Sequence, residues 1–427
     1  MAPIEDHPLR YRLANELHAR PFPSMRAPSA AIYVAFKQPE MAANRDRTQD
    51  LAHLHDLLDR HGVSHPQPGA THYYGQIGKH WLKWEQHTEF VTYTIFTEGV
   101  ADRPFEATAF DPFPQDWLEA APGQRVTSIL VRVEPEPDRD AVEAKLDEWF
   151  VPESLAVSNV LEGSAVVAGD FRIDQNGHMR FAVFVGDETG KRRVGRIVQR
   201  LCEIETYKTM SMLGFARVRA MGAQLGALDT RLTTLVEEMS QEGSKAEETL
   251  QALLSISAEL ETLSAQSSFR FGATAAYEAI VEERVSALRE ARYNGRQTFD
   301  EFMMRRYQPA MRTVLSAKER LEAMSSRGVR AANLLRTRVD VERSAQNQAL
   351  LESMDKRSDL QLRLQRTVEG LSVVAISYYA VSLASYVLYP LEAPTGLSKN
   401  MLTAIVTVPV VFLVWWLVRQ LRKSVEK

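Results

Sequence analysis

The sequence predicts an α+β N-terminal cytoplasmic domain, a long helical stalk or coiled-coil region, and a C-terminal transmembrane hairpin of two helices. Three patterns predict this. Short alternating apolar runs bounded by Gly, Pro and Asn fill residues 1–189. Helix-forming Ala, Glu, Arg and Leu dominate residues 190–369. Two uncharged runs near the end each approach the roughly 20 residues that span a bilayer.

The N-terminal part mixes strand and helix patterns. We expect strands at 30–36, 72–77, 80–86, 89–96, 125–133, 164–173 and 178–186, and helices at 9–20, 44–61, 114–120 and 138–149. Asn176–Gly177 signals a hairpin between the last two strands. Because no regular strand–helix–strand rhythm is present, we expect a mixed sheet. Leu9, Leu13 and Leu17 share one side of the first helix, so we expect that helix to dock on the domain.

The stalk region reads as a few very long helices. We expect one helix over 192–240, weakest at Gly222 and Gly226, then two helices over 244–268 and 271–292. From Gln297 a helical pattern continues into the first apolar run. Helices of this length need partners along their length, from the same chain or from other copies.

The two apolar runs predict a transmembrane hairpin, with helices at 370–391 and 401–418 and a short extracytoplasmic loop at 392–400. Basic residues precede the first run and follow the second, where residues 419–427 form a basic tail. The positive-inside rule then places both termini in the cytoplasm and the protein in an inner (plasma) membrane. The expected anchors at the membrane interface are Arg363, Arg366, Trp415, Trp416, Arg419, Arg422 and Lys423. The alternative is a buried helical hairpin of a soluble protein.

Hydroxyl groups are unusually frequent in the first apolar run. At about 100° per residue, all its Ser and Tyr residues except Ser377 fall within an arc of roughly 140°. The opposite face, which we expect to meet lipid, consists of Val373, Ile376, Ala380, Leu383, Ala384 and Val387. The hydroxyl stripe Tyr378, Ser382, Ser385 and Tyr389 continues the stalk seam Leu350, Met354, Leu364, Val368 and Leu371, which Arg357 and Gln361 interrupt. Two hypotheses fit: ordinary helix packing, or copies of this helix around a central axis lined by hydroxyls.

Other features argue against several classes of function. The net charge of -4 argues against a nucleic-acid binder. The single cysteine, Cys202, excludes a disulfide framework and a Cys-rich zinc site. The N-terminus is polar, so we expect no cleavable signal peptide. Gly186 and Gly190 are too close for a Walker A loop before Lys191, and we expect a polar strand-to-helix turn there.

Histidines are concentrated in the N-terminal part. Seven lie close together, at His53, His55, His61, His65, His72, His80 and His87. Their spacing is irregular and lacks an HExxH arrangement, so we expect surface or packed histidines and leave the metal site unknown. We expect no cofactor and no enzyme activity.

Three stretches carry a family resemblance: "HPLRYRLANELHARPFP", "KWEQHTEFVTYTIF" and "RTVEGLSVVAISYYAVSL". With these the whole chain resembles a bacterial domain-of-unknown-function family of uncharacterised membrane-anchored proteins. The resemblance implies a bacterial inner-membrane protein and supplies no activity.

The order of the parts is also similar to that of CorA-type magnesium channels, in which copies of the first span line the pore and a Gly-Met-Asn motif guards its mouth. The loop here, "YPLEAPTGLSKNM", has no such motif, so magnesium selectivity does not follow. By position, the resemblance implies that Tyr378, Ser382, Ser385 and Tyr389 face the pore and that Glu392 lies at its outer mouth.

The leading hypothesis is therefore a CorA-like homo-oligomer in membrane lipid, assembled through the stalk and the first span. It passes cations and has a cytoplasmic regulatory domain. The alternative is a membrane-anchored scaffold or signalling protein that binds a cytosolic partner. A metal-dependent hydrolase built on the N-terminal histidines is the third hypothesis.

Overall fold

The computed structural model describes residues 4–16, 22–39, 45–239, 241, 245–388, 390 and 398–425. The chain divides into two compact units. Unit 1 comprises Met1–Ser244 and Gln251–Ala331, and unit 2 comprises Lys245–Leu250 and Ala332–Lys427.

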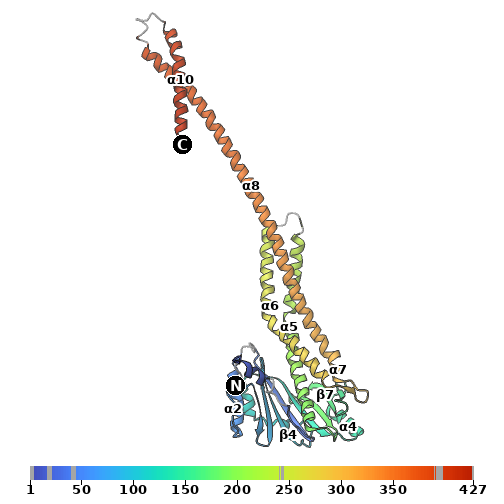
Figure 1. Cartoon of the computed structure of the whole chain (residues 1–427). Coiled ribbons are helices and arrows are strands. Elements are labelled where there is room, and N and C mark those ends of the chain that lie inside the picture. The colour runs from blue at the N-terminus through green and yellow to red at the C-terminus, as the bar shows by residue number, and fades with distance from the viewer. Residues whose placement is uncertain are drawn as a thin grey trace. The chain divides into compact units, whose positions relative to one another are not determined.

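A mixed sheet is the centre of unit 1 (Figure 1). Its strand order is β2-β3-β4-β1-β5-β8-β7-β6-β9, and β5 and β8 pair in parallel while the other pairs are antiparallel. The strands are β1 (Ser29–Lys37), β2 (His72–Ile77), β3 (His80–Gln86), β4 (Phe90–Glu98), β5 (Gln124–Pro135), β6 (Ala156–Val160), β7 (Ala165–Ile173), β8 (Met179–Val185) and β9 (Ala291–Arg292). Every strand expected from the sequence is present, which confirms the α+β class with a mixed sheet. Two further strands, β6 and β9, were not expected.

One face of the sheet is covered by short helices. They are α2 (Arg47–Arg60), η2 (Ala107–Phe110), α3 (Gln115–Glu119) and α4 (Arg139–Trp149). Asp46 and Asp138 cap α2 and α4, each accepting a backbone N–H of the first turn. Beneath α2 and α3, alternate residues of β1, β3 and β4 form an apolar core that includes Val34, Leu82 and Tyr93. A second core lies beneath α4.

The opposite face is covered by α5 (Lys191–Met239), which crosses β1, β5 and β8. Its buried residues include Val194, Ile197 and Leu201. The chain before β1 passes so close to α5 that a Cβ at Gly195 would lie 1.8 Å from the carbonyl oxygen of Pro23. Only glycine fits there, because any side chain would force the backbone segment off the helix.

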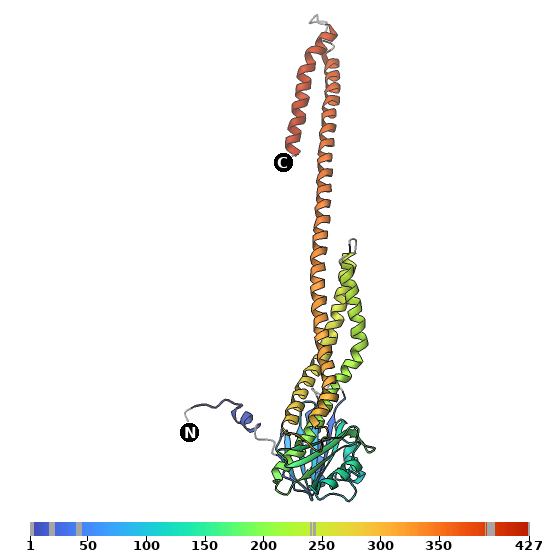
Figure 2. The same ribbon diagram turned by 90° about the vertical axis from the view of Figure 1, so that its right-hand side faces the viewer.

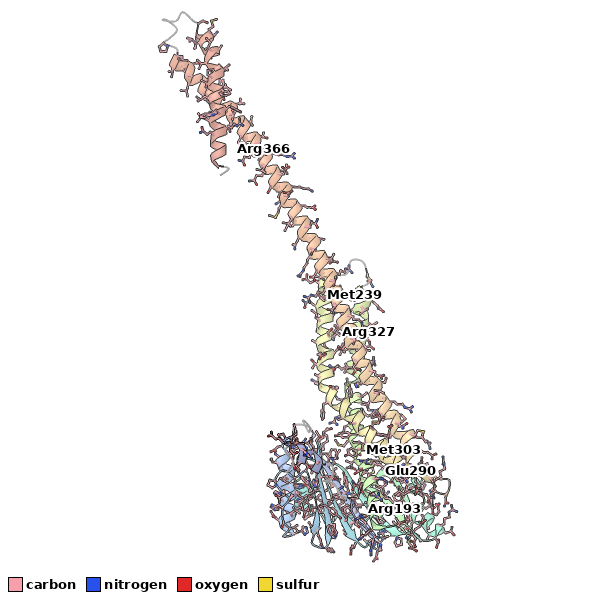
Figure 3. The ribbon with its side chains drawn as sticks, viewed as in Figure 1. Arg193, Met239, Glu290, Met303, Arg327 and Arg366 are labelled. Atoms are coloured by element: carbon pink, nitrogen blue, oxygen red, sulfur yellow. The ribbon has the colours of Figure 1, made fainter. Side chains whose placement is uncertain are left out.

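Beyond the sheet, α5 packs with α6 (Ala246–Ser286) and the first part of α8 (Gln308–Leu388). Within unit 1, Asp229 of α5 forms ion pairs with Arg320 (2.6 Å) and Arg327 (2.5 Å) of α8 (Figure 3). The shared interior of these helices includes Leu228, Leu232, Leu253, Ile256, Leu260, Leu321 and Met324, all buried. A short helix, α7 (Phe299–Phe302), and a π-helical turn, η3 (Met303–Tyr307), precede α8. Pro309 is the second residue of α8, directly after the π-helical turn. Proline has no backbone N–H to donate, and the wider π turn accommodates it at this point of the helix.

Two expectations were wrong. The stretch predicted as two helices, 244–268 and 271–292, is mainly the single helix α6, because the buried residues Leu263, Ser267, Phe271 and Thr274 keep one face in register across Gly272. The helix α1 (Arg10–Glu16) does not dock: Leu9, Tyr11 and Leu13 are all exposed (Figure 2). A helix of 7 residues offers little apolar area, and Leu17 lies outside the described residues.

A buried ion pair joins the sheet to α6. Glu89, which is fully buried next to β4, accepts hydrogen bonds from Arg270 and from the Tyr277 hydroxyl at 2.9 Å. We predict that Arg270→Met lowers the free energy of unfolding by about 3–5 kcal/mol, because it leaves an uncompensated buried carboxylate. Denaturant unfolding followed by tryptophan fluorescence measures the loss. The double variant Glu89→Gln, Arg270→Met is the control and should lose less, since it buries no charge. An equal loss in both variants would assign the effect to packing.

Asp229 predicts an acid-sensitive contact between α5 and α8. Hydrogen bonding to Arg320, and then to Arg327, lowers the pKa of Asp229. A carboxyl whose native pKa is depressed adds stability above its unfolded value and loses that contribution as the pH falls through the native value. We therefore expect Asp229→Asn to flatten the acid limb of a stability profile measured from about pH 7 to about pH 3. Glu238→Gln, at an exposed position further along α5, should leave the limb unchanged.

Candidate functional site on the two apolar helices

Two helices in the described residues are long and apolar enough to cross a membrane: the one that ends at Leu388 and the one at Lys399–Gln420. The first is the end of α8, and the second lies in α10 (Lys399–Val425). Only 6% of the most apolar window of each is buried. Large side chains such as Val374, Leu383, Val408 and Phe412 are exposed instead. Exposed apolar surface of this extent marks a contact with lipid or with another protein.

The two helices pack against each other along a narrow stripe of small and β-branched residues. Ser377 on α8 and Val414 on α10 are each 6% exposed. Val373, Ala380 and Ala384 around Ser377 are half-buried. Such residues let two helices approach closely in a bilayer. Part of the face that we expected to meet lipid is covered by α10, while Ile376, Leu383 and Val387 on the same face are exposed. Ser377, the hydroxyl that falls outside the predicted stripe, is the most buried of them.

The tyrosines of the hydroxyl face are exposed in the single chain, whereas Ser382 and Ser385 are half-buried. Tyr378, Tyr379 and Tyr386 are 71%, 68% and 77% exposed. Ser382 and Ser385 donate to backbone carbonyl oxygens of the preceding turn, at 2.9 Å to Tyr378 and 2.8 Å to Val381. A serine bonded in this way needs no water to satisfy its proton, although its oxygen still accepts. Of the other predicted pore residues, Tyr389 and Glu392 lie outside the described residues.

The predicted interface anchors are exposed wherever their side chains are described. On α8, Arg363 pairs with Asp359 at 3.0 Å, and Arg366 lies one turn nearer the apolar segment (Figure 3). On α10, the guanidinium of Arg419 lies 5.1 Å from the ring centre of Trp415, and Trp416 is exposed beside it. Arg422 and Lys423 belong to α10, but their side chains are outside the described set.

The part of α8 between the helix bundle and the apolar segment has no cover. Every residue from Asp340 to Val368 is exposed, including large apolar side chains at Val341, Leu350, Leu351, Met354, Leu360, Leu362, Leu364 and Val368. Leu350, Met354, Leu364, Val368 and Leu371 follow one another in steps of three and four or their sums. We name these five residues the α8 seam. Exposed apolar residues at this spacing are typical of a helix that packs against a partner helix.

The N-terminal histidines do not come together. His53 is buried in the core, where its ring nitrogens lie 2.9 Å from the Tyr93 hydroxyl and 2.9 Å from the Trp117 carbonyl oxygen. His55 and His65 stack on each other with ring centres 4.0 Å apart. Among the described residues, no group of three or more His, Cys, Asp or Glu is arranged to hold a metal ion. The loop Gly186–Gly190 between β8 and α5 is a polar strand-to-helix turn, as expected, with the Thr189 N–H donating to the Gly186 carbonyl at 3.0 Å.

Comparison with known proteins identifies a matching family, but the description of that family states no activity. The sequence model of the family described as "Protein of unknown function (DUF3422)" matches residues 5–425. The search of curated proteins finds no match.

Proposed function

Because the chain belongs to the DUF3422 family, whose description states no activity, we propose a function from the physical arrangement: a homo-oligomeric membrane protein in which copies of α8 surround a central axis. The axis passes cations, and unit 1 acts as a cytoplasmic regulatory domain. The observation that carries the proposal is the α8 seam, which is exposed throughout and runs in line with the hydroxyl face, where Tyr378 is exposed and Ser382 and Ser385 are half-buried.

Burial energy supports the assembly. Burying a leucine or methionine side chain stabilises a protein by about 1.5–3 kcal/mol. The five residues of the seam are all exposed in the single chain, and no described residue of unit 2 covers them. A second copy of the same helix supplies the complementary surface at every level. Copies in one membrane share one orientation, so their α8 helices must be parallel.

The hydroxyl face supports passage of an ion. Hydroxyl and carbonyl oxygens can replace the water around a cation when they line a narrow path. Tyr378, Ser382 and Ser385 are on the face that continues the seam, and all three retain an oxygen that can accept. Arg357, on the same line at the cytoplasmic side, opposes this role, because a ring of guanidinium groups repels cations. A cation that moves along the axis from the hydroxyl face toward the cytoplasm must therefore leave the axis before it reaches the level of Arg357.

The alternative function is a membrane-anchored scaffold that binds a cytosolic partner through the same exposed stretch of α8. The back-bonded hydroxyls of Ser382 and Ser385 favour it, since serines satisfied by their own helix can face lipid. Replacing the two apolar helices with an unrelated helical hairpin separates the two functions. If the protein with the replaced hairpin still fulfils its role in cells, the result would support the scaffold and contradict the channel.

The assembly predicts that Leu364→Glu converts the oligomer into a monomer in mild detergent, because it places like charges against one another at the centre of the seam. Light scattering coupled to size-exclusion chromatography measures the mass. Leu362→Glu is the matched control: Leu362 is also exposed (54%, against 66% for Leu364) but points about 160° away from Leu364 at about 100° per residue. The interface would lie elsewhere if both variants kept the mass of the natural protein.

Ion passage predicts that Ser382→Leu or Ser385→Leu abolishes potassium flux into liposomes while the oligomer stays intact, since leucine removes an oxygen and narrows the path. Val387→Leu, on an exposed apolar position of the same helix, is the control and should conduct normally. Chloride flux is measured in parallel. Chloride flux without potassium flux would contradict the cation path. It would indicate instead that the Arg357 guanidinium groups make the path selective for anions. No flux of either ion through an intact oligomer would leave only the scaffold.

A further inference from the structure

A cavity of about 220 Å³ lies in unit 1 between the sheet and α5. Its floor is formed by Tyr33 of β1 and by alternate residues of β3 and β4, on the face opposite the apolar core. Its roof is one side of α5, from Val198 to Tyr207, and Arg284 of α6 closes one end. The cavity lies wholly within unit 1 and has no part in the membrane proposal.

The floor of this cavity is polar where the rest of the sheet under α5 is apolar. Below the same helix, β5 and β8 present the buried residues Val131, Val133 and Val183. On β3 and β4, the corresponding face presents Lys83, Thr92 and Thr94, which are 4%, 3% and 7% exposed. Burying polar groups costs free energy unless each finds a partner. Thr92 donates to the Glu85 carbonyl oxygen at 3.4 Å, which leaves Lys83 and Thr94 as the groups on this floor with hydrogen-bonding capacity for a ligand.

Hydrogen-bond donors without enough acceptors meet at the floor. Lys83 and Thr94 are directly paired neighbours on adjacent strands. The Lys83 ammonium carries three N–H groups, and its partners are Gln199 Oε1 at 3.0 Å and Glu85 Oε2 at 3.1 Å. The Thr94 hydroxyl has no hydrogen-bond partner among the residues that the structure describes. These two donors suit the oxygens of a carboxylate.

Acceptors lie on the opposite wall. The carboxylate of Glu203 on α5 accepts from Gln199 Nε2 at 2.6 Å and from Arg284 Nε. Phe90 and Tyr207 stand beside it, with ring centres 6.1 Å apart. A carboxylate next to aromatic faces is the usual environment for a bound ammonium group. Gln199 therefore separates a carboxylate-binding end at Lys83 from an ammonium-binding end at Glu203.

The basic and acidic side chains that line the cavity are equal in number, which limits the net charge that a ligand can carry. Two basic side chains, Lys83 and Arg284, face two acidic ones, Glu85 and Glu203. A ligand with a large net charge, such as a nucleotide, would leave this balance uncompensated. A molecule with one positive and one negative group fits both ends without changing it. Phe96 and Val198 provide an apolar wall for a short carbon chain.

We propose that this cavity binds a free α-amino acid with an apolar side chain, holding its carboxylate at Lys83 and Thr94 and its ammonium at Glu203. The ligand breaks no covalent bond. It replaces the water of a polar cavity and completes the hydrogen bonds of its floor.

The test is isothermal titration of the full-length protein in detergent with leucine, and with 4-methylpentanoate and isopentylamine as the matched acid and amine. We expect leucine to bind and each half-molecule to bind at least about tenfold more weakly, because each loses one charged hydrogen-bonded contact. Equal binding of 4-methylpentanoate would overturn the ammonium end. Absence of heat with a panel of apolar amino acids would overturn the proposal and assign the cavity to water.

Variants separate binding from folding. Thr94→Val keeps the shape of the side chain and removes only the hydroxyl, so we expect leucine to bind about tenfold more weakly while the thermal unfolding midpoint stays unchanged. Thr97→Val, on the same strand but outside the cavity lining, should bind leucine normally. Glu203→Gln should weaken leucine and leave 4-methylpentanoate unaffected. Unchanged leucine affinity in both Thr94→Val and Glu203→Gln would contradict the site.

Discussion

The exposed seam of α8 is the constraint on which the rest of the molecule depends. In unit 1 the first part of α8 is covered by α5 and α6, and Leu321 and Met324 are buried there. From Asp340 to Val368 no described residue of unit 2 covers the helix, although leucine and methionine continue along it. In proteins most of the stability of a helix comes from the packing of its apolar face. This stretch of α8 therefore carries an apolar surface that the described residues leave uncovered.

The helix α5 connects the two structured regions of unit 1. Its first half covers the sheet, apolar over β5 and β8 and polar over β3 and β4. Its second half packs in the helix bundle, where Asp229 holds Arg320 and Arg327 of α8. The helix is continuous between the cavity near Cys202 and Asp229, so one element contacts both the sheet and α8.

Sequence patterns predicted the elements better than the sites. Strands were predictable because alternation marks a half-buried sheet, whereas β6 carries Ser158 and Asn159 and β9 has only 2 residues. The cavity was not predictable, since "KWEQHTEFVTYTIF" shows alternation but not that α5 lies over its polar half. On the apolar helices, periodicity identified the open hydroxyl face. It missed the packed role of Ser377, whose only signal was Ala380 one turn later and Ala384 a further turn on.

Arg357 and Gln361, which interrupt the α8 seam, bear on how many copies the proposed assembly holds. In the proposed parallel arrangement, identical residues of the copies meet at the same level, so Arg357 faces Arg357 and Gln361 faces Gln361. Polar residues in a helical seam lower stability but restrict register and oligomer number. Arginine has a long flexible side chain that can turn outward from the axis. Asp355 and Asp359 lie two residues to either side of Arg357 on the same exposed helix; Asp359 pairs with Arg363 of its own chain, so Asp355 of a neighbouring copy is the carboxylate that could neutralise Arg357 in the proposed assembly. A narrow dimer would crowd the arginines at its centre, whereas a wider ring gives each one access to the flank of its neighbour, so the charge pattern favours the ring.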